Sequence, residues 1–180
     1  MSFGTARMKD LLDGAGIRWA VAAGAAVYIY TGSRPPTDLD LMVRPEDLAR
    51  AGECLGVAPV AAVGPWGEVT KVARDPVEIV GRLVVRLDGR SFPYEMDQEM
   101  LGRARRSVFE GVEVPVLAPE DVIALKAVLQ RGPDQGKHDL EDIDALAAMV
   151  AVDVGYLRLR LERMGGVDRA RPVLERWGWG

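Results

Sequence analysis

Two aspartates stand at the start of an apolar segment, in the run Asp38-Leu39-Asp40-Leu41. In a β-strand, residues i and i+2 point to the same face, so the two carboxylates converge while the leucines face the core. Their mutual repulsion must be offset by raised pKa values or by a divalent cation. Oxygen ligands on a rigid strand suit Mg²⁺ or Mn²⁺. The run therefore predicts a strand over 39–43 with a metal site, with a solvated turn before a strand as the alternative.

Small and polar residues precede the two acids. Ala23, Gly24 and Ala25 follow a predicted strand, where small side chains let backbone N–H groups and a helix N-terminus approach a phosphate. Tight packing of a helix on the sheet is the alternative explanation. Arg34 could contact a phosphate or lie on the surface of a proline-rich loop, and Thr37 could position the acid-bearing strand.

A third acid is expected on a neighbouring strand, and Glu78 is the best candidate. It lies inside an apolar predicted strand, where a charge is costly unless it is exposed or partnered. Three carboxylates on two strands would hold two metal ions, the arrangement used for nucleotidyl transfer. Glu68, Asp75 and Asp88 lie nearer to turns and are better explained as solvated. Lys126, in a mostly apolar helix, either reaches an acid or phosphate or extends to solvent.

Hydrophobic periodicity and Gly/Pro breaks divide the chain into elements. The predicted strands are 17–22, 39–43, 57–63, 69–73, 77–85 and 112–117. The predicted helices are 5–13, 27–30, 45–55, 97–106, 119–129, 137–150, 154–164 and 168–177. Pro115 favours an edge position for strand 112–117, because proline cannot donate to a sheet ladder. We expect a mixed α/β core over 1–118 and a helical part over 119–180.

Composition excludes several classes of protein. The formal net charge of −4 over 180 residues provides no basic field for non-specific binding of duplex DNA. Cys54, the single cysteine, can form neither an internal disulfide nor a zinc site, which favours a reducing, cytoplasmic compartment. The longest apolar run, 19–30, is too short to cross a membrane, so no membrane association is expected.

The run from Ala23 to Leu41 resembles the DNA polymerase β-type nucleotidyltransferase superfamily. The hallmark of that superfamily is a Gly-Gly or Gly-Ser turn followed by Asp-x-Asp or Asp-x-Glu, with a later acid on another strand. The second half resembles small bacterial and archaeal members, which include toxin-type nucleotidyltransferases of toxin–antitoxin systems. The residues that carry this second likeness are Val116-Leu117-Ala118-Pro119-Glu120-Asp121, Lys126, Arg131 and Lys137-His138-Asp139-Leu140-Glu141-Asp142-Ile143.

This resemblance implies an α/β (α+β) fold with a short mixed sheet flanked by helices, and a magnesium-dependent transferase activity. A nucleoside monophosphate would pass from an NTP, such as ATP, to an acceptor hydroxyl on RNA, protein or a small molecule. Asp38, Asp40 and Glu78 would bind Mg²⁺ or Mn²⁺, with Glu78 as the base toward the acceptor. Gly24 with Ala23 or Ala25 would lie beside the triphosphate, and Lys126 near the phosphates or the acids.

Two alternatives to an active, independent enzyme follow from the same residues. The alanines beside Gly24 and the glutamate at position 78 depart from the usual residues of the superfamily, so a weak or inactive nucleotide-binding or partner-binding member is the second reading. A component of a toxin–antitoxin pair is the third. The expected macromolecular partner is a second copy of the chain or a small antitoxin.

Overall fold

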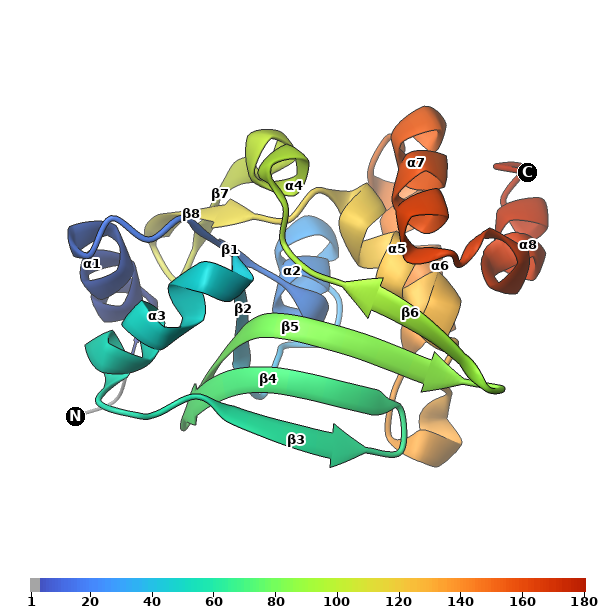
Figure 1. Cartoon of the computed structure of the whole chain (residues 1–180). Helices are drawn as coiled ribbons and strands as arrows, with labels where there is room; N and C mark the ends of the chain where they lie inside the picture. The colour runs from blue at the N-terminus through green and yellow to red at the C-terminus, as the bar shows by residue number, and fades with distance from the viewer. Residues whose placement is uncertain (1–3) are drawn as a thin grey trace.

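The computed structural model describes residues 4–180, and one eight-stranded mixed sheet organises them (Figure 1). Its order is β3-β4-β5-β2-β1-β8-β7, and β6 pairs with β5 off this path. The strands are β1 (Trp19–Val21), β2 (Leu39–Val43), β3 (Val60–Gly64), β4 (Gly67–Arg74), β5 (Val77–Leu87), β6 (Arg90–Tyr94), β7 (Arg105–Phe109) and β8 (Val112–Val116). The expected mixed sheet with flanking helices is thus confirmed.

The helices pack against the sheet, and those of the C-terminal part form a group beside it (Figure 1). They are α1 (Thr5–Gly14), α2 (Ala23–Thr31), α3 (Leu48–Leu55), α4 (Gln98–Arg103), α5 (Pro119–Leu129), α6 (Asp139–Met149), α7 (Val154–Met164) and α8 (Val167–Arg176), with short 3-10 turns at Pro45–Asp47 and Pro133–Gln135. In Figure 1, α1 and α3 lie at the N-terminal side of the molecule, whereas α5 to α8 gather at the other. No helix within residues 4–180 has the length and hydrophobicity to cross a membrane.

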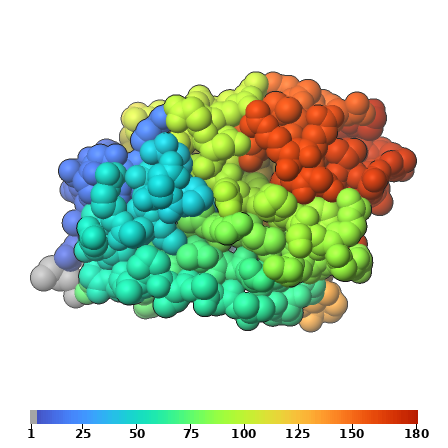
Figure 2. Space-filling view, viewed as in Figure 1, coloured from blue at the N-terminus to red at the C-terminus, as the bar shows by residue number. Residues whose placement is uncertain are grey.

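Helix α5 joins the C-terminal helices to the sheet. All but one of its residues are buried, because it packs against α2, α6, α7 and α8 at once. One apolar core runs from the strands through α5 into α7 and α8. In the space-filling view the C-terminal helices lie directly against the strands (Figure 2), so the helical part and the sheet pack together.

The centre of the sheet is formed by short buried strands. All three residues of β1 are buried, and β1 pairs antiparallel with β2. Strand β2 pairs in parallel with β5, and in this register Asp40 stands opposite Glu78. In β2, Leu39 and Leu41 are buried and Asp40 is half-buried on the other face, as the alternation of the sequence predicts.

Strand β5 contains an irregularity that sets which of its side chains share a face. Thr70 of β4 pairs with Arg82, but Lys71 pairs with Val80, so Gly81 is an extra residue on β5. A Cβ at Gly81 would lie 2.8 Å from the Leu48 side chain of α3, which explains why glycine fits at this position. The bulge switches the alternation, so residues 78 and 80 share a face with residues 83 and 85.

The structure corrects the expectations for the strands that follow. The predicted helix 97–106 ends at Arg103, because Ala104 is extended and the chain enters β7. Neither β6 nor β7 was predicted. Strand β8 is not an edge strand: it lies between β1 and β7, and β7 forms the edge. Pro115 is tolerated because β1 reaches β8 only at Val116, so most of β8 has a partner on one side.

Candidate active site

The predicted acids meet where two cavities join. The apolar cavity, of about 310 Å³, lies between β4, β5, β6 and α5, and Asp40 and Glu78 both line it. The polar cavity, of about 320 Å³, lies between the start of α2, the loop before β2 and the start of α6, and Asp38 and Asp40 line it. Asp40 therefore lines both cavities, whereas Glu78 lines only the apolar cavity and Asp38 only the polar one.

Asp40 has the most perturbed ionisation of the three acids. Burial raises the pKa of its carboxyl to about 6, and the negative charges of Glu78 and Asp38 add to this shift. The cations of Lys137 and Lys71 oppose the rise. An acid whose pKa is raised by neighbouring carboxylates occupies the environment that a divalent cation stabilises.

The side chains of the other two acids have protein partners. Lys71 Nζ lies 2.6 Å from Glu78 Oε1, and Thr37 donates a short hydrogen bond to Asp38. In this arrangement no group of three or more His, Cys, Asp or Glu side chains within residues 4–180 is close enough to hold a metal ion. The donor types fit Mg²⁺ or Mn²⁺, because carboxylates from two adjacent strands share one cavity wall, and Lys71 holds the Glu78 carboxylate in the place that a cation would take.

The small-residue segment forms the first turn of α2 beside the acids. Ala23 and Gly24 line the polar cavity, and a Cβ at Gly24 would meet nothing within 4 Å, so the backbone there is open to a ligand. Ala23 has φ of 48°, in the left-handed region that favours glycine. Ala25 is fully buried and lines neither cavity, and its place beside a nucleotide stays a prediction.

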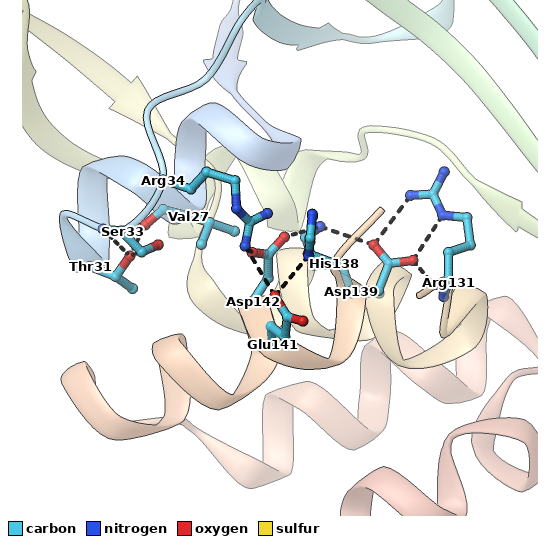
Figure 3. A network of polar contacts seen from close by, with 10 residues as sticks. Val27, Thr31, Ser33, Arg34, Arg131, His138, Asp139, Glu141 and Asp142 are labelled. Atoms are coloured by element: carbon cyan, nitrogen blue, oxygen red, sulfur yellow. Dashed lines mark hydrogen bonds and ion pairs between the residues drawn. The ribbon is translucent and has the colours of Figure 1, made fainter. Parts of the chain in front are cut away.

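A network of charged side chains closes the far wall of the polar cavity (Figure 3). Asp139 accepts hydrogen bonds from Lys126 Nζ at 3.1 Å and from Arg131 Nε at 2.8 Å. Asp142 Oδ2 lies 2.8 Å from Lys126 Nζ, and Asp142 Oδ1 lies 3.3 Å from Arg34 Nη2. Lys126 therefore reaches acids, as predicted, but these are the acids of α6. Arg34 and Lys126 both line the polar cavity, as Asp40 does.

Three cations at the site were not assigned a role from the sequence. Arg131 and Lys137 line both cavities, and Lys71 lines the apolar cavity next to Glu78. Lys137 is exposed and makes no ion pair with any residue from 4 to 180, which leaves its ammonium group available to an anion. The available signals were Arg131 and the Lys137-His138-Asp139 segment, both of which the family likeness already includes. Lys71 gave no signal, because its pairing with Glu78 depends on the register of β4 and β5.

The chain has the nucleotidyltransferase fold. Residues 93–170 match the family model described as nucleotidyl transferase of unknown function (DUF2204). The match confirms the predicted resemblance to nucleotidyltransferases. It spans β6 to α8, and the acids at 38, 40 and 78 lie before it.

Solved structures with the same fold include the antibiotic-resistance factor ANT(2'')-Ia. Its solution structure has a TM-score of 0.56 and 15% identity and covers 95% of this chain and 93% of its own. A crystal structure of ANT(2'')-Ia in complex with adenylyl-2''-tobramycin has a TM-score of 0.55 and 15% identity, over 91% of this chain and 95% of that chain. A Thermotoga maritima protein described as a nucleotidyltransferase has a TM-score of 0.50 and 18% identity, over 73% of this chain and 84% of that chain. No curated protein sequence matches this chain.

Proposed function

We propose that the chain is a divalent-metal-dependent nucleotidyltransferase that moves a nucleoside monophosphate from an NTP such as ATP to an acceptor hydroxyl. The observation that carries this proposal is the position of Asp40, which stands opposite Glu78 on adjacent strands at the junction of two cavities. A transferase needs two adjoining ligand sites with the reacting groups at their boundary.

In this proposal the polar cavity holds the triphosphate. The first turn of α2 offers backbone N–H groups and the positive end of the helix at Ala23 and Gly24. Lys126, Arg131 and Lys137 supply positive charge from the opposite wall, and Thr37 positions Asp38. The Arg34 guanidinium also lines this cavity, where it forms ion pairs with Glu141 and Asp142 of α6.

Asp38, Asp40 and Glu78 would hold Mg²⁺ or Mn²⁺, which supplies charge neutralisation for the triphosphate and the leaving group. The acceptor hydroxyl oxygen attacks the α-phosphorus, the bond to the β-phosphate oxygen breaks, and pyrophosphate leaves. Glu78, the acid that lines only the apolar cavity, accepts the hydroxyl proton on its carboxylate. The remaining contribution of the chain is positioning and charge stabilisation.

The acceptor is an RNA, a protein or a small molecule. The complex of ANT(2'')-Ia with adenylyl-2''-tobramycin supports a small molecule, because that structure shares the fold of this chain. A cytoplasmic reaction is proposed because a single cysteine suits a reducing compartment, and a second copy of the chain or a small antitoxin is the proposed protein partner.

The test measures transfer of labelled nucleotide with Mg²⁺ or Mn²⁺ to RNA, protein and small-molecule acceptors. Asp40→Asn keeps the shape of the side chain and removes its charge, so we expect transfer to fall by at least about a hundredfold. Asp134→Asn, at an exposed position in the loop before α6, is the matched control and should keep the wild-type rate. Equal labelling by Asp40→Asn and wild type would remove the proposed catalytic role.

A binding module without turnover is the second candidate, and one contact favours it. Lys71 forms an ion pair with the Glu78 carboxylate. A protein without metal-dependent catalysis could keep this ion pair permanently. Calorimetric titration separates the two candidates. NTP binding that is independent of Mg²⁺ or Mn²⁺, without transfer to any acceptor, would support the module.

A further inference from the structure

The walls of the apolar cavity differ in chemistry from those of the polar cavity. Most of its lining side chains are hydrocarbon or aromatic, contributed by the sheet on one side and by α5 on the other. They are Trp66, Val69, Val80, Leu83, Val85, Tyr94, Val122, Leu125 and Leu129. Its volume of about 310 Å³ lies at the lower end of the range for small-molecule sites, about 300–1,000 Å³.

The bulge at Gly81 creates the sheet side of this wall. Because of the bulge, Val80 and Leu83 face the same way as Glu78, and their partners on β4 are Lys71 and Val69. The apolar wall is therefore continuous with the acid that would accept the hydroxyl proton. A molecule that contacts Leu83 and extends along β5 reaches Glu78.

Trp66 closes one end of the wall, and the backbone fixes its position. The backbone oxygen of Trp66 accepts a hydrogen bond of 2.9 Å from the Arg86 amide. Gly67, the next residue, has φ of 129°, and a Cβ there would lie 2.0 Å from the backbone oxygen of Val84. Only glycine allows the turn to approach β5 this closely, which places the Trp66 ring over the cavity.

The charges around the apolar cavity leave no free carboxylate for a cationic ligand. Glu68 lies 2.7 Å from the Arg86 guanidinium, and Glu78 lies 2.6 Å from Lys71. Asp40 is the one remaining acid on the wall, and in the proposed function it is a metal ligand. Of the remaining cations in the lining, Lys126 and Arg131 are paired with the acids of α6, and Lys137 makes no ion pair within residues 4–180. A polycation would meet an apolar surface there, with the Lys137 ammonium group and no unpaired carboxylate apart from Asp40.

We propose that the apolar cavity binds the acceptor, and that the acceptor is a small uncharged alcohol with an apolar or aromatic body. This inference rests on the proposed function, since it assigns the polar cavity to the triphosphate. The hydroxyl lies at the Glu78 end, and the hydrophobic body packs between Trp66, Leu83 and Leu125. Trp66 and Leu125 are then specificity-determining residues.

The binding test uses naphthylethanol as the probe, with tobramycin as the polycationic comparison, titrated by calorimetry into the full chain. We expect naphthylethanol to bind saturably and tobramycin to bind more weakly. Trp66→Ala and Leu125→Asp should each weaken naphthylethanol binding by at least about tenfold, because they remove apolar contact or place a charge in the cavity. Leu140→Asp, at an exposed leucine of α6 outside both cavities, is the control and should bind as wild type does.

Binding of MgATP to the same variants separates this inference from the proposed function. We expect its affinity to stay within about twofold of wild type, since the triphosphate lies in the other cavity. A parallel loss of MgATP affinity in both cavity variants would show that the cavity holds the nucleobase, and would overturn the inference. Tighter binding of tobramycin than of naphthylethanol, or no binding of naphthylethanol to wild type, would also overturn it. Naphthylethanol binding as expected without nucleotidyl transfer would support the apolar site and refute the proposed reaction.

Discussion

Asp139 anchors α6 to α5, and its substitution should reveal how much the charged network contributes to stability. The carboxylate is 1% exposed and accepts hydrogen bonds from Lys126 Nζ, Arg131 Nε, Arg131 Nη2 and the Arg131 amide, at 2.8–3.2 Å. Asp139→Asn keeps the shape of the side chain but removes the negative charge. Lys126 retains Asp142 at 2.8 Å, whereas Arg131 loses its carboxylate partner.

Breaking a buried ion pair by changing one partner costs about 3–5 kcal/mol, and the surviving contact of Lys126 with Asp142 places this variant near about 3 kcal/mol. For a domain of this size, such a loss lowers the melting temperature by about 6–12 °C. Thermal and urea unfolding at neutral pH measure the change, with Asp134→Asn as the exposed control on the preceding loop. A loss no larger than that of the control would refute the view that this network stabilises α6.

The same variant has a defined pH dependence. Burial raises the pKa of Asp139, but the hydrogen bonds and charges of Arg131 and Lys126 outweigh it and hold the pKa below its ordinary value of 3.8. A lowered folded-state pKa contributes stability above the unfolded value, and this stability is lost as the pH falls through the folded value. The difference in unfolding free energy between wild type and Asp139→Asn should therefore be constant near neutral pH and shrink below 3.8.

Three further substitutions test local features. Ala23→Gly should stabilise the chain by about 0.5–1 kcal/mol in urea unfolding, because φ of 48° is strained for alanine; a loss of stability would contradict this. Gly67→Ala should cost at least about 2 kcal/mol in the same assay, because its Cβ would clash with the Val84 carbonyl; unchanged unfolding would contradict the close approach. Lys71→Met should tighten Mn²⁺ binding measured by calorimetry, because it frees the Glu78 carboxylate; unchanged affinity would show that Lys71 does not compete with the metal.

The central strands and the acids could be predicted because their signals are local. Alternation along Asp38-Leu39-Asp40-Leu41 specifies one buried and one polar face, and the structure shows Leu39 and Leu41 buried with Asp40 on the other side. Glu78 is predicted from the cost of a charge in an apolar strand alone. The parallel pairing of β2 with β5 then places Glu78 opposite Asp40, which the sequence did not specify. Their roles as metal ligands stay a prediction.

The elements and contacts that escaped prediction depend on distant parts of the chain. Strands β6 and β7 carry few apolar residues, and they form because β5 and β8 offer open edges for pairing. The apolar cavity depends on the register of β4 and β5. No periodicity in the sequence predicts that the side chains of β5 change face at Gly81. The ion pair between Lys71 and Glu78 follows from that same register. In each case the missing information is which strands become neighbours.

The extra residue at Gly81 divides β5 into two halves with separate duties. The half before it carries Glu78 beside Asp40, and the half after it carries Leu83 and Val85 on the cavity wall. Deleting that one residue would leave an unbroken alternation, so Leu83 and Val85 would stay on the cavity wall and the first half would keep its pairing with β2. The extra residue therefore governs the local bend and twist of β5 and not which side chains line the cavity, so the curvature of the wall can change without disturbing the carboxylates.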